Sequence, residues 1–284
     1  MAKLSAHVNN VALHHTIFSL PFAYMSAYLA FKTHGMAVDL WIFVWITLAI
    51  TGARSAALAL DNLADLKYDS QQERLSYRAM VKGEVTPREA KISIVIFLAV
   101  FILAVLQLPR ICLYLLPAAA LPFLIYPYTK RFTWLCHFVL GIAIAMAPAG
   151  AWVAVTEEVV AMPMLMLCFA VALWIAAFDA VYGSQDESFD ISQGLHSMAT
   201  RFGAHGALII CRWLHAISVI CFLALGSMLG LNALYFVGVC VAAVTLFYQH
   251  RIVRADDYSR VTQRYFMRNG IVSIAMLLFT VFSI

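Results

Sequence analysis

Six aspartates follow two very apolar segments of this 284-residue chain at the spacing of a helix face. The first set is Asp61, Asp65 and Asp69, and the second set is Asp179, Asp186 and Asp190. At about 100° per residue, the first set falls within about 80° and the second within about 40° of one another. Carboxylates stacked in this way repel, and at the end of a membrane helix they are costly unless cations bind them. The two stripes predict a polyvalent metal site that holds an anionic ligand between them.

Two arginines, Arg74 and Arg78, follow the first stripe within a few residues. Mg²⁺ prefers carboxylate and phosphate oxygens, and arginine forks bind phosphate oxygens in bidentate fashion. This order predicts a diphosphate ligand. The basic turn of Lys130 and Arg131 could also bind the diphosphate, although a positive-inside bias of the loops explains it as well. Solvated loop charges would explain one acidic stripe alone, but they explain two matching stripes poorly.

Three further positions are candidates for substrate binding. Tyr182 is expected on the face of the second stripe, as a hydrogen-bonding group or as an interfacial aromatic. Arg54 precedes Asp61 by seven residues, so we expect it to pair with the acidic cluster or to contact a substrate carboxylate or phosphate. His15, or its neighbour His14, could bind a carboxylate or hydroxyl group of a substrate, and the other would lie at the membrane interface.

The composition places these residues in a membrane protein. Hydrophobic residues make up 63% of the chain and charged residues 12%, and the mean hydropathy is +0.85. These values lie outside the soluble range and predict an all-α, polytopic membrane protein. The net charge of +4 is explained by topology and anionic lipids, with no basic face for nucleic acid. The six cysteines lie in or beside apolar segments and are interpreted as packing residues.

Nine apolar segments are long enough to span a bilayer, which requires about 20 residues. They cover residues 11–33, 38–60, 91–109, 112–129, 132–155, 161–182, 207–228, 231–249 and 267–284. The first is too long for a signal peptide and is expected to stay uncleaved. No Pro/Gly/Ser-rich linker divides the chain, so a single domain is predicted over residues 1–284.

Lysine and arginine predict the orientation, because they concentrate in cytoplasmic loops. In the nine-span arrangement, 15 of the 19 lie on one side. The amino terminus and both acidic stripes are therefore expected on the cytoplasmic side of a bacterial-type inner (plasma) membrane.

The motifs together resemble the UbiA superfamily of intramembrane prenyltransferases. The resemblance is carried by D61-N-L-A-D-L-K-Y-D69, by D179-A-V-Y-G-S-Q-D-E-S-F-D190 and by Y126-P-Y-T-K-R131. It implies a bundle of nine helices in which two Mg²⁺ ions bind a polyprenyl diphosphate. By this resemblance, Asp65, Asp69, Asp186 and Asp190 are metal or diphosphate ligands. Asp179 and Tyr182 take the leading positions of the second motif, and Arg74 and Arg78 match the phosphate-binding arginines.

Finer features are similar to the 4-hydroxybenzoate polyprenyltransferase-like branch, closest to the MqnP-like enzymes of the futalosine route to menaquinone. They are H15-T-I-F-S-L-P-F-A-Y24, G52-A-R-S-A-A57, T129-K-R-F-T133 and G194-L-H-S197. One departure is Asp61 followed by Asn62, where the family has Asn and then Asp or Arg. It leaves open which of the two residues contacts the metal.

The resemblance implies Mg²⁺-dependent transfer of a polyprenyl group from its diphosphate to a carbon of an aromatic acid, either 1,4-dihydroxy-6-naphthoate or 4-hydroxybenzoate. The product would enter menaquinone or ubiquinone synthesis. One alternative is a cation-coupled transporter, because intramembrane acids also mark ion pathways. Another is a prenyltransferase of the same superfamily with heme or chlorophyllide as acceptor. The prenyl chain length and the oligomeric state are not predicted.

Overall fold

The computed structural model describes residues 6–8, 10, 11 and 13–284. The side chains of residues 13, 14, 263, 264 and 266 lie outside this description. The described residues form helices, and their only β-type pairing is an isolated bridge between Arg254 and Asp257. The predicted all-α class is confirmed.

The chain divides into two compact units, which are described one at a time. Unit 1 comprises Met1–Thr16 and Leu40–Leu116, and unit 2 comprises Ile17–Asp39 and Pro117–Ile284. The single domain over residues 1–284 stays a prediction.

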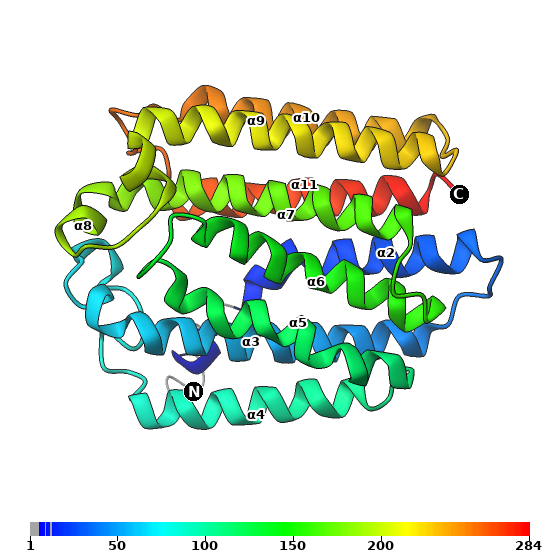
Figure 1. Cartoon of the computed structure of the whole chain (residues 1–284), viewed down its shortest axis with the longest axis horizontal. Helices are drawn as coiled ribbons and strands as arrows, with labels where there is room; N and C mark the ends of the chain where they lie inside the picture. The colour runs from blue at the N-terminus through cyan, green and yellow to red at the C-terminus, as the bar shows by residue number, and fades with distance from the viewer. Residues whose placement is uncertain (1–5, 9, 12) are drawn as a thin grey trace. The chain divides into compact units, whose positions relative to one another are not determined.

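Unit 1 is built on two helices that pack side by side (Figure 1). Its elements are α3 (Leu40–Asp69), η2 (Glu73–Leu75), α4 (Pro87–Val105) and the first part of α5 (Arg110–Thr129). The helices approach closely at Gly52, where a Cβ atom would lie 2.8 Å from the backbone of Phe97 and of Phe101. Small residues allow such close approach of membrane helices. Helix α4 begins with a capping box, in which Thr86 and Glu89 satisfy each other's backbone N–H groups.

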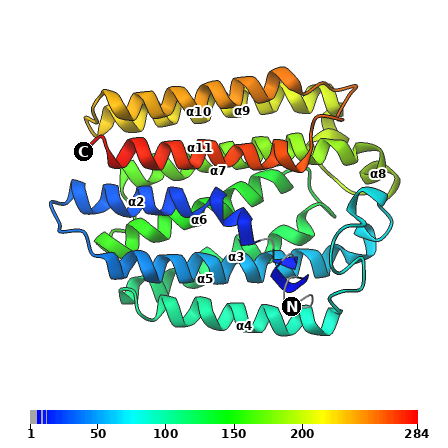
Figure 2. The ribbon, with the colours of Figure 1, turned by 180° about the vertical axis from the view of Figure 1, so that it is seen from behind.

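Unit 2 forms a closed ring of long helices. Its elements are η1 (Leu13–Phe18, in part), α2 (Leu20–Thr33), the end of α5, α6 (Cys136–Thr156), α7 (Met162–Gly183), η3 (Ser184–Asp186), α8 (Glu187–Ser192), α9 (Met198–Met228), α10 (Ala233–Ile252) and α11 (Gln263–Val281). Each of α2, α6, α7, α9, α10 and α11 packs against the next, and α11 returns to α2. Figure 2 shows α2, α11 and α10 from behind.

Helix α7 belongs to the most buried candidate membrane span of unit 2. The apolar window of α7 and α8 is 72% buried, against 6% for α5. Trp174 on α7 packs edge-on against Phe18, Phe22 and Phe178, with ring centroids 5.2–6.4 Å apart. Edge-to-face aromatic pairs of this kind add stability beyond the area that they bury. The second acidic set therefore begins on this buried helix, at Asp179.

Each predicted span overlaps a helix, and six helices of the described residues are long and apolar enough to cross a membrane by length and composition. The count of nine spans stays a prediction. The first segment is not continuous, because a 3-10 turn ends at Phe18 and α2 starts at Leu20 with Pro21 in its first turn. Proline fits a first helical turn, where its missing N–H costs no hydrogen bond.

We expect Gly141→Ala to destabilise unit 2. A Cβ atom at Gly141 of α6 would overlap the carbonyl oxygen of Ala172 on α7, whereas Gly150, on the same helix, has open space around its Cβ position. Overpacking of a helix interface typically costs about 1–3 kcal/mol. The midpoint of thermal unfolding in detergent should therefore fall by several degrees for Gly141→Ala and stay the same or rise for Gly150→Ala. Equal midpoints for the two variants would contradict the close approach of α6 and α7.

Candidate active site

The first acidic stripe lies on one unbroken helix, as its spacing predicted. Helix α3 continues past the apolar segment and ends at Asp69. Asp61 and Asp65 are half-buried, whereas Asp69 is only 5% exposed. The guanidinium of Arg78 donates to the Asp69 carboxylate and forms an ion pair with it. The end of α3 is therefore an acidic face with a cation bound at its last residue.

The acidic face stabilises the protonated form of Arg78. Burial lowers the pKa of Arg78, but the charges of Asp69 and then of Asp61 outweigh that effect, so its pKa is raised. Arg78 stays protonated at any physiological pH. Arg74, the second predicted phosphate ligand, is half-buried in the 3-10 turn η2 of the same connection. The structure thus places both arginines in the segment that follows the stripe.

Asn62 has a structural contact inside unit 1. Its amide nitrogen donates to the backbone oxygen of Asn10 at 2.6 Å. This nitrogen therefore holds the amino-terminal segment, while Asp61 acts on Arg78. Arg54, two turns before Asp61, is 9% exposed on α3. Its pairing with the acidic face stays a prediction.

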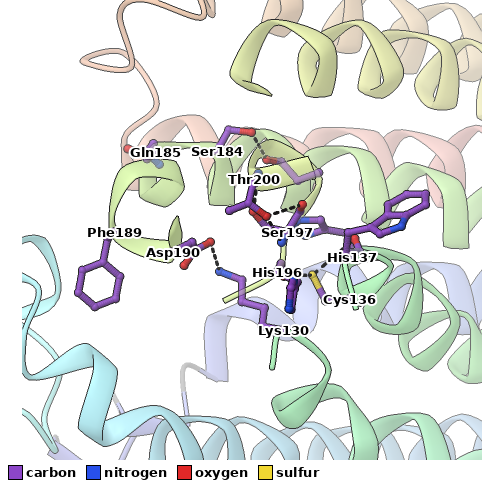
Figure 3. A network of polar contacts seen from close by, with 12 residues as sticks. Lys130, Cys136, His137, Ser184, Gln185, Phe189, Asp190, His196, Ser197 and Thr200 are labelled. Atoms are coloured by element: carbon purple, nitrogen blue, oxygen red, sulfur yellow. Dashed lines mark hydrogen bonds and ion pairs between the residues drawn. The ribbon is translucent and has the colours of Figure 1, made fainter. Parts of the chain in front are cut away.

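The second acidic set has its own bound cation. Lys130 Nζ donates to Asp190 Oδ2 at 3.1 Å, and Asp190 is 1% exposed (Figure 3). Burial lowers the pKa of Lys130. The negative charges of Asp190 and then Asp186 raise it by more than burial lowers it, so the pKa lies above its ordinary value. Lys130 was predicted from a two-residue basic turn, and the structure shows that it neutralises a buried carboxylate.

Backbone hydrogen bonds join the segment after α5 to the segment before α9 around this ion pair. The amide of His196 donates to the Lys130 carbonyl oxygen at 2.6 Å, and Cys136 Sγ donates to the His196 carbonyl oxygen at 3.7 Å. The amide of Leu195 donates to the Asp190 carbonyl oxygen at 2.8 Å. The turn is closed by Gly194 at φ +66°, a conformation that favours glycine. The segments 129–133 and 194–197, which the sequence analysis singled out separately, thus lie side by side.

The second stripe does not lie on one continuous α-helix, and that expectation was wrong. Asp179 lies on α7, which ends at Gly183, and Asp186 lies in the 3-10 turn η3. Asp190 lies on the short helix α8. A 3-10 turn advances by about 120° per residue instead of about 100°, so its three residues widen the angular spread of the three carboxylates from about 40° to about 80°.

Asp179 has a partner that the sequence analysis missed. Its carboxylate accepts a hydrogen bond from His137 Nδ1 at 2.7 Å, and the His137 ring is buried. The available signal was a single histidine at the start of an otherwise apolar span. Because the two residues are far apart in the chain, no local spacing could pair them.

The remaining candidates lie as follows. Tyr182 packs against the apolar cluster that includes Val181 and Tyr265. The guanidinium of Arg131 lies 5.0 Å from the centre of the Tyr128 ring. His15 is half-buried in the turn η1, and the side chain of His14 lies outside the described residues. Their substrate-binding roles stay predictions.

The donor chemistry of the two acidic sets suits magnesium. Within the described residues, no group of three or more His, Cys, Asp or Glu side chains could hold a metal ion by itself. Mg²⁺ is usually bound through one or two carboxylates, with the other positions filled by water and substrate phosphates. The carboxylates of α3, η3 and α8 are ligands of that hard, all-oxygen kind.

Comparison with known proteins gives the class of the molecule. The UbiA prenyltransferase family matches residues 19–271. The 4-hydroxybenzoate octaprenyltransferase of Citrobacter koseri is 32% identical over 241 residues, which cover 84% of this chain and 82% of the relative. The enzyme of the same name from Aeromonas salmonicida is 29% identical over 233 residues, with 81% and 79% covered.

Two solved structures share the fold. The apo structure of a UbiA homolog from Aeropyrum pernix K1 has a TM-score of 0.84 and 30% sequence identity, covering 95% of this chain and 98% of the other. A UbiA homolog from Archaeoglobus fulgidus bound to GPP and Mg²⁺ has a TM-score of 0.71 and 18% identity, covering 98% and 99%.

The molecule is an integral membrane enzyme that transfers prenyl groups. The chain belongs to the UbiA prenyltransferase family, as its acidic motifs indicated.

We expect Lys130→Met to destabilise the protein by about 3 kcal/mol, because it leaves the buried carboxylate of Asp190 without its cation. The double variant Lys130→Met/Asp190→Asn should recover part of this loss. The matched control is Arg131→Met, which removes an exposed charge from the adjacent position and should change stability by less than about 1 kcal/mol. Thermal unfolding in detergent measures all three. Equal losses for Lys130→Met and Arg131→Met would show that Asp190 does not depend on Lys130.

Proposed function

We propose that the protein transfers a polyprenyl group from polyprenyl diphosphate to a ring carbon of an aromatic acid, with release of diphosphate. The observation that carries this proposal is that each unit holds an acidic set with a cation bound to its most buried carboxylate. Solvated loop charges would not be buried and paired in this way. The curated relatives, named 4-hydroxybenzoate octaprenyltransferases, support the aromatic acceptor.

We propose Mg²⁺ as the cofactor, with two ions as the expected number. The carboxylates that would hold it are Asp61, Asp65 and Asp69 in unit 1 and Asp186 and Asp190 in unit 2. Asp179, whose carboxylate is bonded to His137, is the weakest member of the predicted set. When bound, Mg²⁺ would neutralise charge on the diphosphate. The binding of GPP and Mg²⁺ by the Archaeoglobus fulgidus homolog supports this assignment.

The chain's own cations stabilise the departing diphosphate. As the carbon–oxygen bond breaks, negative charge accumulates on the leaving group, and fixed positive groups lower the energy of that state most when they need no rearrangement. Arg78 and Lys130 are already held by carboxylates. Arg74 lies in the same connection as Arg78 and would grip further phosphate oxygens.

The carbon left behind is an allylic cation, which must be kept from water until an electron-rich ring carbon attacks it. Membrane-spanning helices exclude water, and aromatic rings favour a nearby cation. The attacking ring then loses a proton and regains its aromaticity. Tyr182, His15 and Arg54 are proposed to contact the substrates.

For the acceptor we propose 4-hydroxybenzoate or 1,4-dihydroxy-6-naphthoate, so that the product serves ubiquinone or menaquinone synthesis. The proposed location is a bacterial-type inner membrane, with the amino terminus and the acidic sets on the cytoplasmic side. Membership of a prenyltransferase family argues against the transporter alternative. Heme and chlorophyllide stay in the acceptor panel below.

The proposal is tested with purified protein in lipid, labelled polyprenyl diphosphate and a panel of acceptors. We expect prenylation of one of the two aromatic acids with Mg²⁺ present and no turnover in excess EDTA. Readdition of Mg²⁺ should restore the activity, which controls for damage by the chelator. Full turnover in EDTA would exclude a divalent cofactor, and prenylation of heme or chlorophyllide alone would exclude an aromatic acid acceptor.

Asp65→Ala and Asp186→Ala should each lower turnover by two or more orders of magnitude, because each removes a proposed metal ligand from a different unit. Both residues are half-buried, so the variants should still insert and fold. Glu84→Gln, an exposed acid of unit 1 beside Lys82, is the control and should keep normal turnover. Near-normal turnover of a folded aspartate variant would remove that residue from the site.

A further inference from the structure

Arg212 is a charge in the middle of an apolar helix that faces outward. It lies on α9, a candidate membrane span, and it is exposed there beside Trp213, which is 68% exposed. Within the described residues, Arg212 forms no hydrogen bond or ion pair. A charged side chain on the outward face of a membrane helix is costly unless it reaches water or an anionic partner. Such a side chain needs an anionic partner or a path to the membrane surface.

A cavity of about 330 Å³ lies in front of Arg212. One wall is a stripe of α9, and the other is residues 253–256, which follow α10. The α9 residues are His205, Leu208, Ile209 and Arg212. Their spacing of three, four and seven residues is that of one helix face. The cavity is therefore a recess between a helix face and a loop, within unit 2.

The cavity is cationic at its rim and apolar at its base. Arg212 and Arg254 bring two permanent charges, while Leu208 and Val253 are buried. Its acid, Asp256, is 4.0 Å from Arg254 Nε, and both side chains are strongly exposed. Exposed pairs at that distance contribute little, so Asp256 does not satisfy the arginines. This combination suits a phosphate attached to an apolar body.

The position of the cavity suits a lipid headgroup. Its lining residues come from the first half of α9 and from the segment after α10. Figures 1 and 2 show that α9 begins, α10 ends and α11 begins at this end of unit 2. Helix α9 restarts after Gly203, whose backbone is non-helical (φ 72°, ψ 160°). Aromatic residues and cations gather at this end, with Arg251 over Phe247 and Arg268 over Tyr248. Such pairs are typical of the membrane–water interface, to which Arg212 can extend.

We propose that this recess binds the phosphate of an anionic phospholipid, with Arg212 and Arg254 on the phosphate oxygens and the acyl chains lying along the exposed face of α9. A bound lipid would link residues 253–256 to α9 and so stabilise the connection from α10 to α11. The site is independent of the proposed prenyl transfer, since none of its residues belongs to either acidic set.

The test is native mass spectrometry of the whole, detergent-purified protein titrated with dioleoylphosphatidylglycerol. Dioleoylphosphatidylcholine tests the need for net negative charge, and inorganic phosphate tests a free anion. The variants are Arg212→Gln and Arg254→Gln, and the control is Arg251→Gln, which removes the same charge at the same end of α10 outside the recess. Thermal unfolding without added lipid checks that each variant is folded.

We expect the anionic lipid to bind more tightly than the zwitterionic one. One charge-assisted hydrogen bond accounts for a factor of about ten or more in affinity. Arg212→Gln and Arg254→Gln should each weaken phosphatidylglycerol binding by at least that factor, while Arg251→Gln should change it less than about twofold. An equal loss in all three variants would overturn the proposal in favour of general surface charge. Phosphate binding that matches lipid binding and needs Arg212 would overturn it in favour of a free anion.

Discussion

The need to compensate carboxylate charge at the ends of membrane helices governs this structure. Asp69 and Asp190 are among the most buried acids of the chain, and each is held by a cation from the segment beside it. A buried charge without a partner would cost several kcal/mol. The connection after α3 and the turn before α6 must therefore bring Arg78 and Lys130 into place. The geometry that stabilises the resting protein would also hold these cations in place for the proposed diphosphate.

Much of the fold follows from local sequence, because apolar runs of about 20 residues specify membrane helices. The stripe on α3 could also be predicted from the sequence, since its acids repeat every four residues within one helix. The ion pairs differ in this respect. Arg78 is nine residues from Asp69, and the sequence analysis predicted it as a phosphate ligand and not as the partner of Asp69. Lys130 is 60 residues from Asp190, and His137 is 42 residues from Asp179. Only the packing of α6 against α7 determines the latter pairing.

The wrong assignment of the second acidic set to one helix has a local cause in the backbone. The second stripe was assigned to one helix because its acids keep helical spacing, yet α7 stops at Gly183, a poor helix former. The hydroxyl of Ser184 then bonds back to the Ala180 carbonyl, which competes with the backbone ladder. Three residues of 3-10 geometry rotate Asp190 by about 60° relative to Asp179 and so widen the face that these acids share. Pattern counting detects the acids, whereas backbone competition at a single glycine and serine decides where they lie.

The two ion pairs also differ in when they can form during synthesis. At about 5–20 residues per second, Arg78 emerges about 0.5–2 s after Asp69, so unit 1 can neutralise its buried acid almost at once. Lys130 is made about 3–12 s before Asp190. During that interval α6 and α7 must enter the bilayer while the lysine is still without its carboxylate. The charge centre of unit 2 is therefore completed only after two further helices are inserted, and it closes at the step that places α8.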